Sequence, residues 1–229
     1  TRNMAIDQEL LYLVDLFDDD DSVVAKAVDC RIMARGEGVI KDLCTLMKDA
    51  TMADKKEVIE SRMKQYNRHF VLESLKSYAI HAKKGEASLM EGCYLVCALF
   101  KAGLGRSEFY DIFLPMIGEI STEISPLKTA VENVRIFNHI FYKRYGFKAS
   151  DPFSLGEQDS ILLNVINDRK GNPVALSLIY FILAQACGLS IYPLCFTGGF
   201  VAVYEENGKV LFYLDILHEG EIFMEQNLS

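Results

Sequence analysis

The sequence lacks a surplus of positive charge. Its 229 residues carry 24 lysines and arginines against 32 aspartates and glutamates, which gives a net charge of −8. Nucleic-acid binding needs basic side chains to neutralise phosphates, and an anionic membrane surface attracts the same residues. We therefore expect neither a nucleic acid nor a membrane as partner, and we interpret the acidity as a contribution to solubility.

Long apolar runs and a leader pattern are also missing. The longest nearly apolar stretch, 174–189, is too short to span a bilayer and contains a serine and a glutamine. Residues 1–9 show no charged and then apolar segment of the secretory kind. The cysteines are scattered through apolar helix and strand patterns instead of forming a disulfide framework. These features predict a cytoplasmic protein with reduced thiols at Cys30, Cys44, Cys93, Cys97, Cys187 and Cys195.

The first half of the chain consists of helical patterns joined by short loops. Apolar residues recur at helical spacing, and we predict about seven antiparallel helices over residues 1–124. Three of these helices are expected at 55–66, 70–82 and 108–119. The segment 10–47 has an apolar helix, an Asp-rich turn with a Val-Val-x-x-Ala helix start, and a Gly-ended helix. It resembles a HEAT repeat, so we predict a HEAT-like or irregular helical region.

The dipeptide Ser125-Pro126 predicts the boundary between two domains, 1–124 and 125–229. Serine suits an N-cap and proline suits the first position of a helix. Asn172-Pro173 has the same arrangement and predicts the start of a strongly apolar, buried helix that ends before Gly188.

The pattern then changes to strands at 191–196, 200–204 and 210–214. Asn207-Gly208 between the last two predicts a two-residue hairpin turn, with Phe200 opposite Asp215. We therefore predict an α+β fold: a helical N-terminal region followed by a small domain with a buried helix and a three-stranded antiparallel sheet.

Residues 159–188 (DSILLNVINDRKGNPVALSLIYFILAQACG), followed by Thr197-Gly198-Gly199-Phe200 and by Asp215, resemble the bacterial SirB-type transglutaminase-like family. Such papain- and transglutaminase-like cores carry a cysteine at the start of the buried helix, a histidine on the second strand and an Asp or Asn on the third. The resemblance places Pro173, Gly199 and Asp215 at these positions. It therefore implies a vestigial triad with no catalytic residue, that is, a pseudoenzyme.

An enzyme remains the alternative, as a thiol-dependent peptidase or acyltransferase that uses Cys195 with a displaced base, His218. The other interpretation of this pair is a packed strand thiol and a loop histidine. Ser177 is a second candidate nucleophile, although we expect its hydroxyl to bond a carbonyl of its own helix. The missing histidine could leave a pocket for an anion or a peptide carboxylate. Its expected lining is Asn172, Gly198, Cys195 and His139, unless Phe196 or Phe200 fills the space.

Two further groups have structural explanations. Cys93 and Cys97 share a helix face but lack the partners of a metal site, so we expect them in the core. Asp18–Asp21 lacks the spacing of a calcium loop and is typical of a solvated turn before a helix. We expect no metal and no cofactor, and we predict a protein-interaction module with an unidentified protein partner. A purely structural scaffold is the third possibility.

Overall fold

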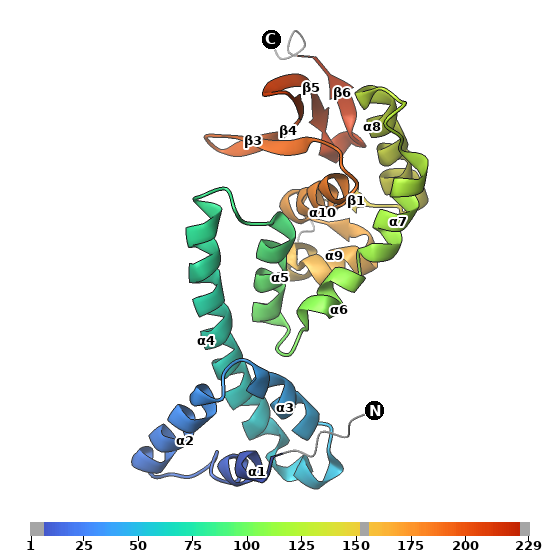
Figure 1. Cartoon of the computed structure of the whole chain (residues 1–229). Helices are drawn as coiled ribbons and strands as arrows, with labels where there is room; N and C mark the ends of the chain where they lie inside the picture. The colour runs from blue at the N-terminus through green and yellow to red at the C-terminus, as the bar shows by residue number, and fades with distance from the viewer. Residues whose placement is uncertain (1–6, 152–155, 225–229) are drawn as a thin grey trace. The chain divides into compact units, whose positions relative to one another are not determined.

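The computed structural model describes residues 7–151 and 156–224, and the chain divides into two compact units, Thr1–Gly105 and Arg106–Ser229 (Figure 1). We describe each unit by itself. The division falls earlier in the chain than the boundary predicted at residues 124 and 125. The reason is that helix α7 (Leu114–Glu123) contacts α10 (Pro173–Ala186) and so belongs to the second unit.

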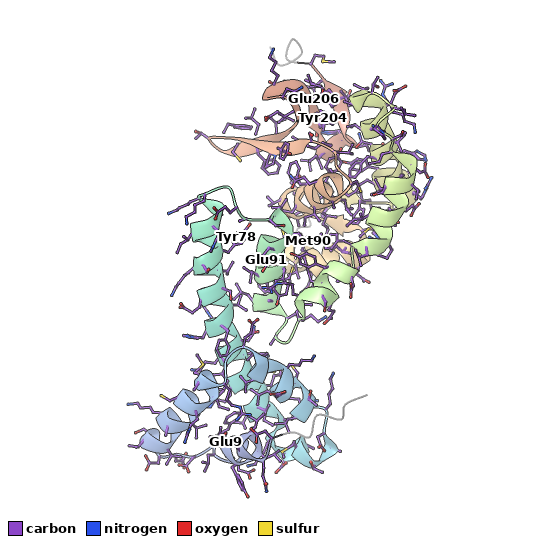
Figure 2. The ribbon with its side chains drawn as sticks, in the orientation of Figure 1. Glu9, Tyr78, Met90, Glu91, Tyr204 and Glu206 are labelled. Atoms are coloured by element: carbon purple, nitrogen blue, oxygen red, sulfur yellow. The ribbon has the colours of Figure 1, made fainter. Side chains whose placement is uncertain are left out.

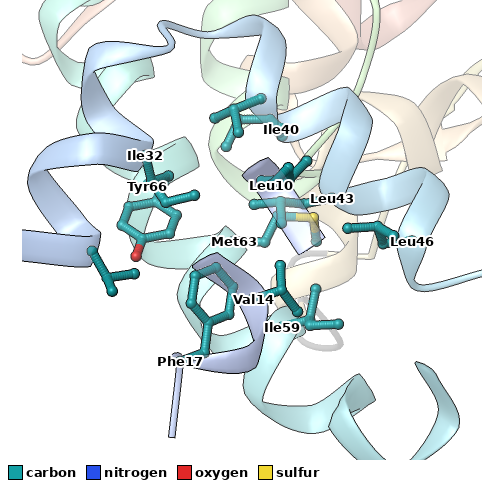
Figure 3. Packing of buried hydrophobic residues seen from close by; sticks show 12 residues of the cluster. Leu10, Val14, Phe17, Ile32, Ile40, Leu43, Leu46, Ile59, Met63 and Tyr66 are labelled. Carbon is teal, nitrogen blue, oxygen red and sulfur yellow. The ribbon is translucent and has the colours of Figure 1, made fainter. Parts of the chain in front are cut away.

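The first unit is helical. Its elements are α1 (Gln8–Asp15), α2 (Ser22–Ala34), α3 (Gly38–Leu46), the 3₁₀ helix η1 (Ala50–Lys55), α4 (Lys56–Ala82) and α5 (Leu89–Phe100). Figure 3 shows side chains from α1, α2, α3 and the first half of α4 meeting in one apolar core, including the fully buried Leu10, Leu43 and Ile59. In the predicted Asp-rich turn, the Asp21 carboxylate caps α2 by accepting the Val23 N–H at 2.7 Å. The HEAT-like character of this region stays a prediction.

Helix α4 runs unbroken from Lys56 to Ala82, so the two helices predicted at 55–66 and 70–82 are wrong. Asparagine is a poor residue for a helix interior when its side chain competes for backbone groups. Here the buried Asn67 side chain donates instead to the carbonyl of Ala98 on α5, at 2.8 Å. The tertiary contact removes the reason for a break.

The second unit begins with helices. They are α6 (Arg106–Asp111), α7, α8 (Ala130–Asn138) and a π-helical turn, η2 (His139–Arg144). The helix predicted at 108–119 is therefore two helices, and Pro115 stands in the first turn of the second one. The predicted cap at Ser125-Pro126 is also wrong. Thr129 caps α8 in a capping box with Glu132, whose carboxylate accepts the Thr129 N–H at 2.7 Å.

The rest of the second unit combines short elements with one sheet. In order they are β1 (Lys148–Ala149), η3 (Glu157–Ser160), α9 (Leu162–Asp168), β2 (Lys170–Gly171), α10, β3 (Ile191–Phe196), β4 (Gly199–Glu206), β5 (Lys209–Asp215), η4 (Ile216–His218) and β6 (Glu221–Phe223). Strands β1 and β2 form a parallel pair, and the antiparallel sheet has the order β3-β4-β5-β6. The α+β fold and the three predicted strands are confirmed. The fourth strand, β6, has three residues and no signal of its own in the sequence.

Helix α10 packs on one face of the sheet (Figure 1). The rings of Phe181 on α10 and Phe200 on β4 lie 5.9 Å apart. Behind them, Tyr180 meets Phe137 and Phe141 edge to face, with ring centroids 4.8 and 5.1 Å apart. Except for the half-buried Phe200, these rings are buried, and they fix α10 between the sheet and α8.

The predicted hairpin turn at Asn207-Gly208 is confirmed, with φ of 51° and 73° at the two residues. Next to the turn the register is the predicted one, since Glu205 pairs with Val210. A β-bulge at Tyr204 and Glu205 then shifts the pairing by one residue, so that Ala202 lies opposite Leu214. The predicted pairing of Phe200 with Asp215 is therefore wrong by one position.

Candidate functional site

A cavity of about 310 Å³ opens in the second unit, where the first turn of α10 meets the start of β4 and the end of β5. Pro173, Gly199 and Asp215 all line it. These are the three positions at which the resemblance places a nucleophile, a base and an orienting carboxylate. Because they come from three separate elements, their meeting in one cavity makes it the candidate site of this domain.

Pro173 occupies the first position of α10 and contributes neither a thiol nor an N–H. The residue before it, Asn172, caps the helix. Its side-chain oxygen accepts the Ala175 N–H at 2.8 Å, and its amide nitrogen donates to the Ser160 hydroxyl at 2.8 Å. An anion at this helix start would need the Ala175 N–H as a donor, but the Asn172 cap already binds it.

Gly199 begins β4 and has no side chain that could act as a base. A Cβ atom at this position would meet the Phe196 ring at 3.4 Å, and the backbone is not in the left-handed region. The backbone therefore does not require glycine here.

Asp215 has both carboxylate oxygens engaged by the segment that follows it. One oxygen accepts the backbone N–H groups of Leu217 and His218, at 3.0 and 3.2 Å, and so caps η4. The other lies 2.8 Å from Nδ1 of the His218 ring. This hydrogen bond, together with the charge of Asp215, raises the pKa of His218. The carboxylate thus holds an imidazole, but the imidazole comes from the wrong segment for a triad.

The segment carrying Asp215 and His218 is held by helices on its other side. Tyr142 donates to the carbonyl of Ile216 at 2.7 Å, and Asn138 donates to the carbonyl of Gly220 at 2.8 Å. The oxygen of Asn138 accepts the buried Tyr180 hydroxyl at 2.6 Å. Burial raises the pKa of both tyrosines, so their hydroxyls stay protonated donors.

Ser177 lies one turn into α10 and lines the same cavity. It is only 3 % exposed. Against expectation, no hydrogen bond joins its hydroxyl to a carbonyl of its own helix or to any other residue that the structure describes. The physical reason is that the hydroxyl faces an open space, where water or a ligand can serve as partner.

The other residues predicted to line the pocket are not among the described residues that line the cavity. Asn172 turns inward to cap α10, and Gly198 forms the β3–β4 turn with φ of 95°. His139 is exposed on η2. Cys195 is exposed on the edge strand β3, opposite Phe200. Phe196 and Phe200 do not fill the space either, although Phe200 forms part of its wall.

Cys195 and His218 are not brought together. Strand β4 lies between β3 and β5, so two strand spacings, about 10 Å, separate Cys195 from the end of β5. The His218 side chain is 76 % exposed and points its free nitrogen to solvent. The geometry for a thiol and its base is therefore missing at this pair within the described part of the chain.

Cys93 and Cys97 are buried in α5, where burial raises the pKa of Cys93 to about 12. Over residues 7–151 and 156–224, no group of three potential ligands is placed to hold a metal ion. No disulfide links any of the six cysteines. Of the helices described, none combines the length and the apolar character needed to cross a bilayer.

A second, larger hollow of about 630 Å³ lies near the end of α7, the start of α8 and β4, with Tyr204 and Glu206 at its side (Figure 2). Several of its polar groups already have partners. Asn133, for example, accepts the Ser125 N–H at 3.0 Å and donates to the Ser125 carbonyl at 2.8 Å. It contains none of the three triad positions, so we do not treat it as the functional site.

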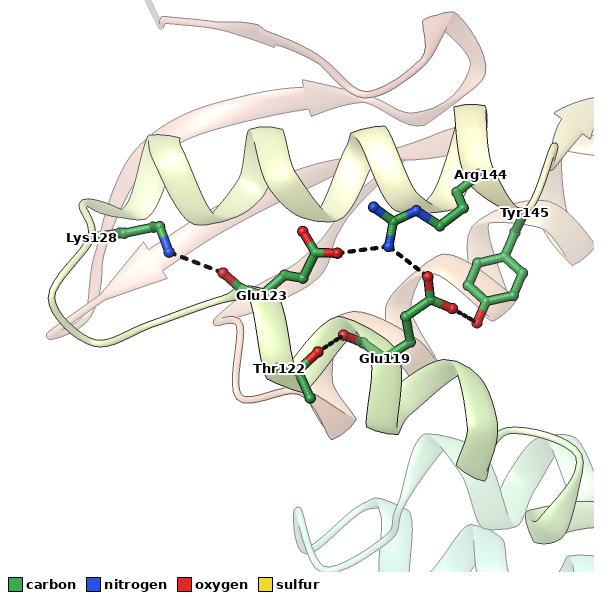
Figure 4. A network of polar contacts seen from close by, with 6 residues as sticks. All are labelled: Glu119, Thr122, Glu123, Lys128, Arg144 and Tyr145. Carbon is green, nitrogen blue, oxygen red and sulfur yellow. Dashed lines mark hydrogen bonds and ion pairs between the residues drawn. The ribbon is translucent and has the colours of Figure 1, made fainter.

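A polar network that sequence reasoning missed ties α7 to the end of η2 (Figure 4). Arg144 binds Glu119 at 2.6 Å and Glu123 at 2.7 Å, and the Tyr145 hydroxyl donates to Glu119. These hydrogen bonds lower the pKa of Glu119 and, with burial as the larger cause, raise that of Tyr145 to about 12. The network is exposed and serves to fix the helices around α10.

Comparison with known proteins agrees with this arrangement. A 111-residue segment is 27 % identical to the UPF0162 protein YchA of Escherichia coli K12, and it matches the protein of the same name from strain O157:H7 equally well. The segment covers 48 % of this chain and 41 % of each relative, so the chain spans less than half the length of the curated relatives it matches. No solved structure matches. The family model of the transglutaminase-like superfamily matches residues 115–229, half of the sequence. The chain therefore belongs to the transglutaminase-like superfamily.

Proposed function

We propose that this protein is a non-catalytic, SirB-like member of the superfamily that binds a partner protein in the reducing cytoplasm. The observation that carries the proposal is the content of the cavity. The three positions expected to hold a nucleophile, a base and an orienting carboxylate meet there, yet two of them are Pro173 and Gly199.

Acyl transfer by such a site needs a nucleophile beside a base that a third group orients. The one hydroxyl on the described lining is that of Ser177, and no imidazole lines the cavity with it. Asp215 already caps η4 and holds His218, so its oxygens are not available to a base inside the cavity. These contacts support binding in place of chemistry.

Binding is supported by the open cavity and by the strand next to it. A volume of about 310 Å³ is near the lower end for ligand pockets. On β3, Tyr192, Leu194 and Phe196 are 45, 45 and 61 % exposed. They alternate along the strand and so share one face. An exposed apolar row of this kind is typical of an interaction surface.

We expect a partner protein to contact the exposed side chains of Tyr192, Leu194 and Phe196 and not the backbone of β3. Strand β3 lies at the sheet edge, where a partner strand could pair with it. Pro193 in the middle of β3 has no N–H to offer, which disfavours strand addition. We therefore expect the partner to bind through side chains.

A thiol-reactive probe at neutral pH tests the enzyme alternative. We expect Cys195 to react within about an order of magnitude of Cys30, which is also exposed and serves as the internal control. His218→Ala should leave that rate unchanged. Selective, fast labelling of Cys195 that slows in the His218 variant would establish a thiol enzyme.

Affinity capture with the full chain tests the binding role against a purely structural one. Gly199→Leu adds a bulky side chain at a lining position of the cavity without backbone strain. Its matched control is Val174→Leu, on an exposed position of α10 that is not among the described lining residues. A partner held by the wild type and the control, but lost with Gly199→Leu, supports the proposal. Identical captures with all three proteins would contradict it.

A further inference from the structure

We propose that the cavity receives the neutral phenol ring of a tyrosine from the partner protein, with its hydroxyl bonded to the Ser177 hydroxyl. This rests on the proposed binding function and adds the chemistry of the group that is bound. Three independent features of the cavity lead to it: an unsatisfied hydroxyl, apolar walls with two aromatic rings, and carboxylates at the rim.

The Ser177 hydroxyl is the polar group that needs a partner. The residue is 3 % exposed, and no described residue bonds its hydroxyl. No fully enclosed side-chain oxygen or nitrogen of the described residues lacks a partner, so the Ser177 oxygen must be reached through the cavity. A buried hydroxyl of this kind favours a ligand with one hydrogen-bonding group.

The walls around Ser177 are apolar. The lining residues include Phe200, Phe223, Val201 and Leu214. Phe200 and Leu214 are on the sheet face that packs against α10, where the Phe200 ring lies 5.9 Å from Phe181. Aromatic walls favour an aromatic ring, since rings pack edge to face and offset. A ring that is apolar on its sides and carries one hydroxyl matches both the walls and the single polar group. Among protein side chains this describes tyrosine.

The charge at the rim selects a neutral ring. Asp215 lines the cavity, and Glu221 lies directly opposite it across β5 and β6. The ring of His218, which can become positively charged, is bound to Asp215. Two adjacent carboxylates repel a further negative charge. They disfavour the anion or peptide carboxylate that the sequence suggested, and they also disfavour a phosphorylated tyrosine.

The partner's neighbouring residues have a surface to rest on. Leu194 lies opposite Val201 in the β3–β4 register, and Val201 lines the cavity. Phe196, at the end of the exposed row, pairs with Gly199, which also lines the cavity. Apolar residues flanking the tyrosine would contact this end of the row while the ring enters the cavity.

Amide chemical shifts of the isotope-labelled full chain provide the test. The probes are p-cresol, toluene and a short uncharged peptide with one central tyrosine, in plain and phosphorylated forms. We expect p-cresol and the plain peptide to shift the signals of Ser177, Val201 and Leu214 in a saturable way. Toluene should bind more weakly, and the phosphorylated peptide should not bind at these residues.

Ser177→Ala should weaken p-cresol binding about twofold to tenfold, as expected for one hydrogen bond, and leave toluene unchanged. Gly199→Leu should abolish the binding of p-cresol and of toluene, whereas Val174→Leu should leave the binding of both unchanged. An unchanged preference for p-cresol in Ser177→Ala, or no shifts at the cavity with the plain peptide, overturns the inference. Partner capture that still depends on residue 199 would, in that case, leave the proposed function standing.

Discussion

The Asp215 carboxylate binds the imidazole of His218, three residues further along the same segment, with 2.8 Å between Oδ2 and Nδ1. In a working triad this carboxylate would orient a histidine from the second strand. Here that position is Gly199, and the acidic residue has taken a local structural role as cap and as partner of a loop histidine. The contacts of this carboxylate are therefore local ones, within the segment 215–218.

The Asp215–His218 contact predicts a specific pH dependence. Because the bond raises the folded-state pKa of His218, its stabilising effect is fully present below the unfolded pKa. The effect is lost as the pH rises through the raised folded value. Asp215→Asn should lower the pKa of His218, as followed by NMR titration of the ring. Glu219→Gln removes an equal charge beside Lys143 and should change that pKa much less. A pKa that is the same in the Asn variant would contradict the assignment.

Gly220 is required by packing as well as by its backbone. A Cβ atom there would lie 2.6 Å from Cγ of Asn138, and φ is 71°. We expect Gly220→Ala to destabilise the second unit by about 1–3 kcal/mol, measured by hydrogen exchange in η4 and β6. Gly208→Ala is the matched control, with φ of 73° and no atom near the added Cβ. Equal costs for the two variants would show that the Asn138 contact contributes nothing.

The buried hydrogen bond from Asn67 on α4 should stabilise the packing of α4 against α5. Asn67→Ala leaves the carbonyl of Ala98 without its buried donor, for a cost of about 1–3 kcal/mol. Faster hydrogen exchange in α5 is the expected signature. The control is Thr45→Ala, which removes an exposed bond to its own helix at 2.9 Å and should have little effect. If both variants exchange like the wild type, α4 is continuous for some other reason.

Some local signals predicted local structure, although the same kind of signal at Ser125-Pro126 did not. The cap at Asn172, the proline start of α10 and the turn at Asn207-Gly208 depend on short-range chemistry, and each is found as predicted. Continuity of α4 could not be predicted, because the partner of Asn67 is 31 residues away.

The candidate site shows the same division. The resemblance points to Pro173, Gly199 and Asp215, and all three line one cavity. The sequence suggested a hydrogen bond from Ser177 to its own helix, and the cavity beside this residue could not be predicted because it depends on how α10 meets the sheet. The β-bulge at Tyr204 and Glu205 shifts the β4–β5 pairings beyond it by one residue. The bulge has no signal in the sequence and is recognised from the strand register alone.

Restoring the missing groups tests whether the scaffold still supports thiol chemistry. Pro173→Cys places a thiol at the start of α10, where the helix dipole favours the thiolate. Helix α10 should persist, because the Asn172 cap does not depend on the proline. We expect labelling by iodoacetamide at pH 7 to be at least about tenfold faster than for Val174→Cys, the exposed control one position further.

Adding Gly199→His and His218→Ala should accelerate labelling further. The first change supplies an imidazole on the cavity wall, and the second releases the Asp215 oxygen that now holds the loop histidine. Ala202 pairs with Leu214, and continuing this register by one residue would set Asp215 opposite Val201. The new ring at position 199 would then have to reach Asp215 diagonally, over about 7–8 Å between backbones. If the triple variant labels no faster than Pro173→Cys alone, the shifted register has removed the triad geometry as well as its side chains.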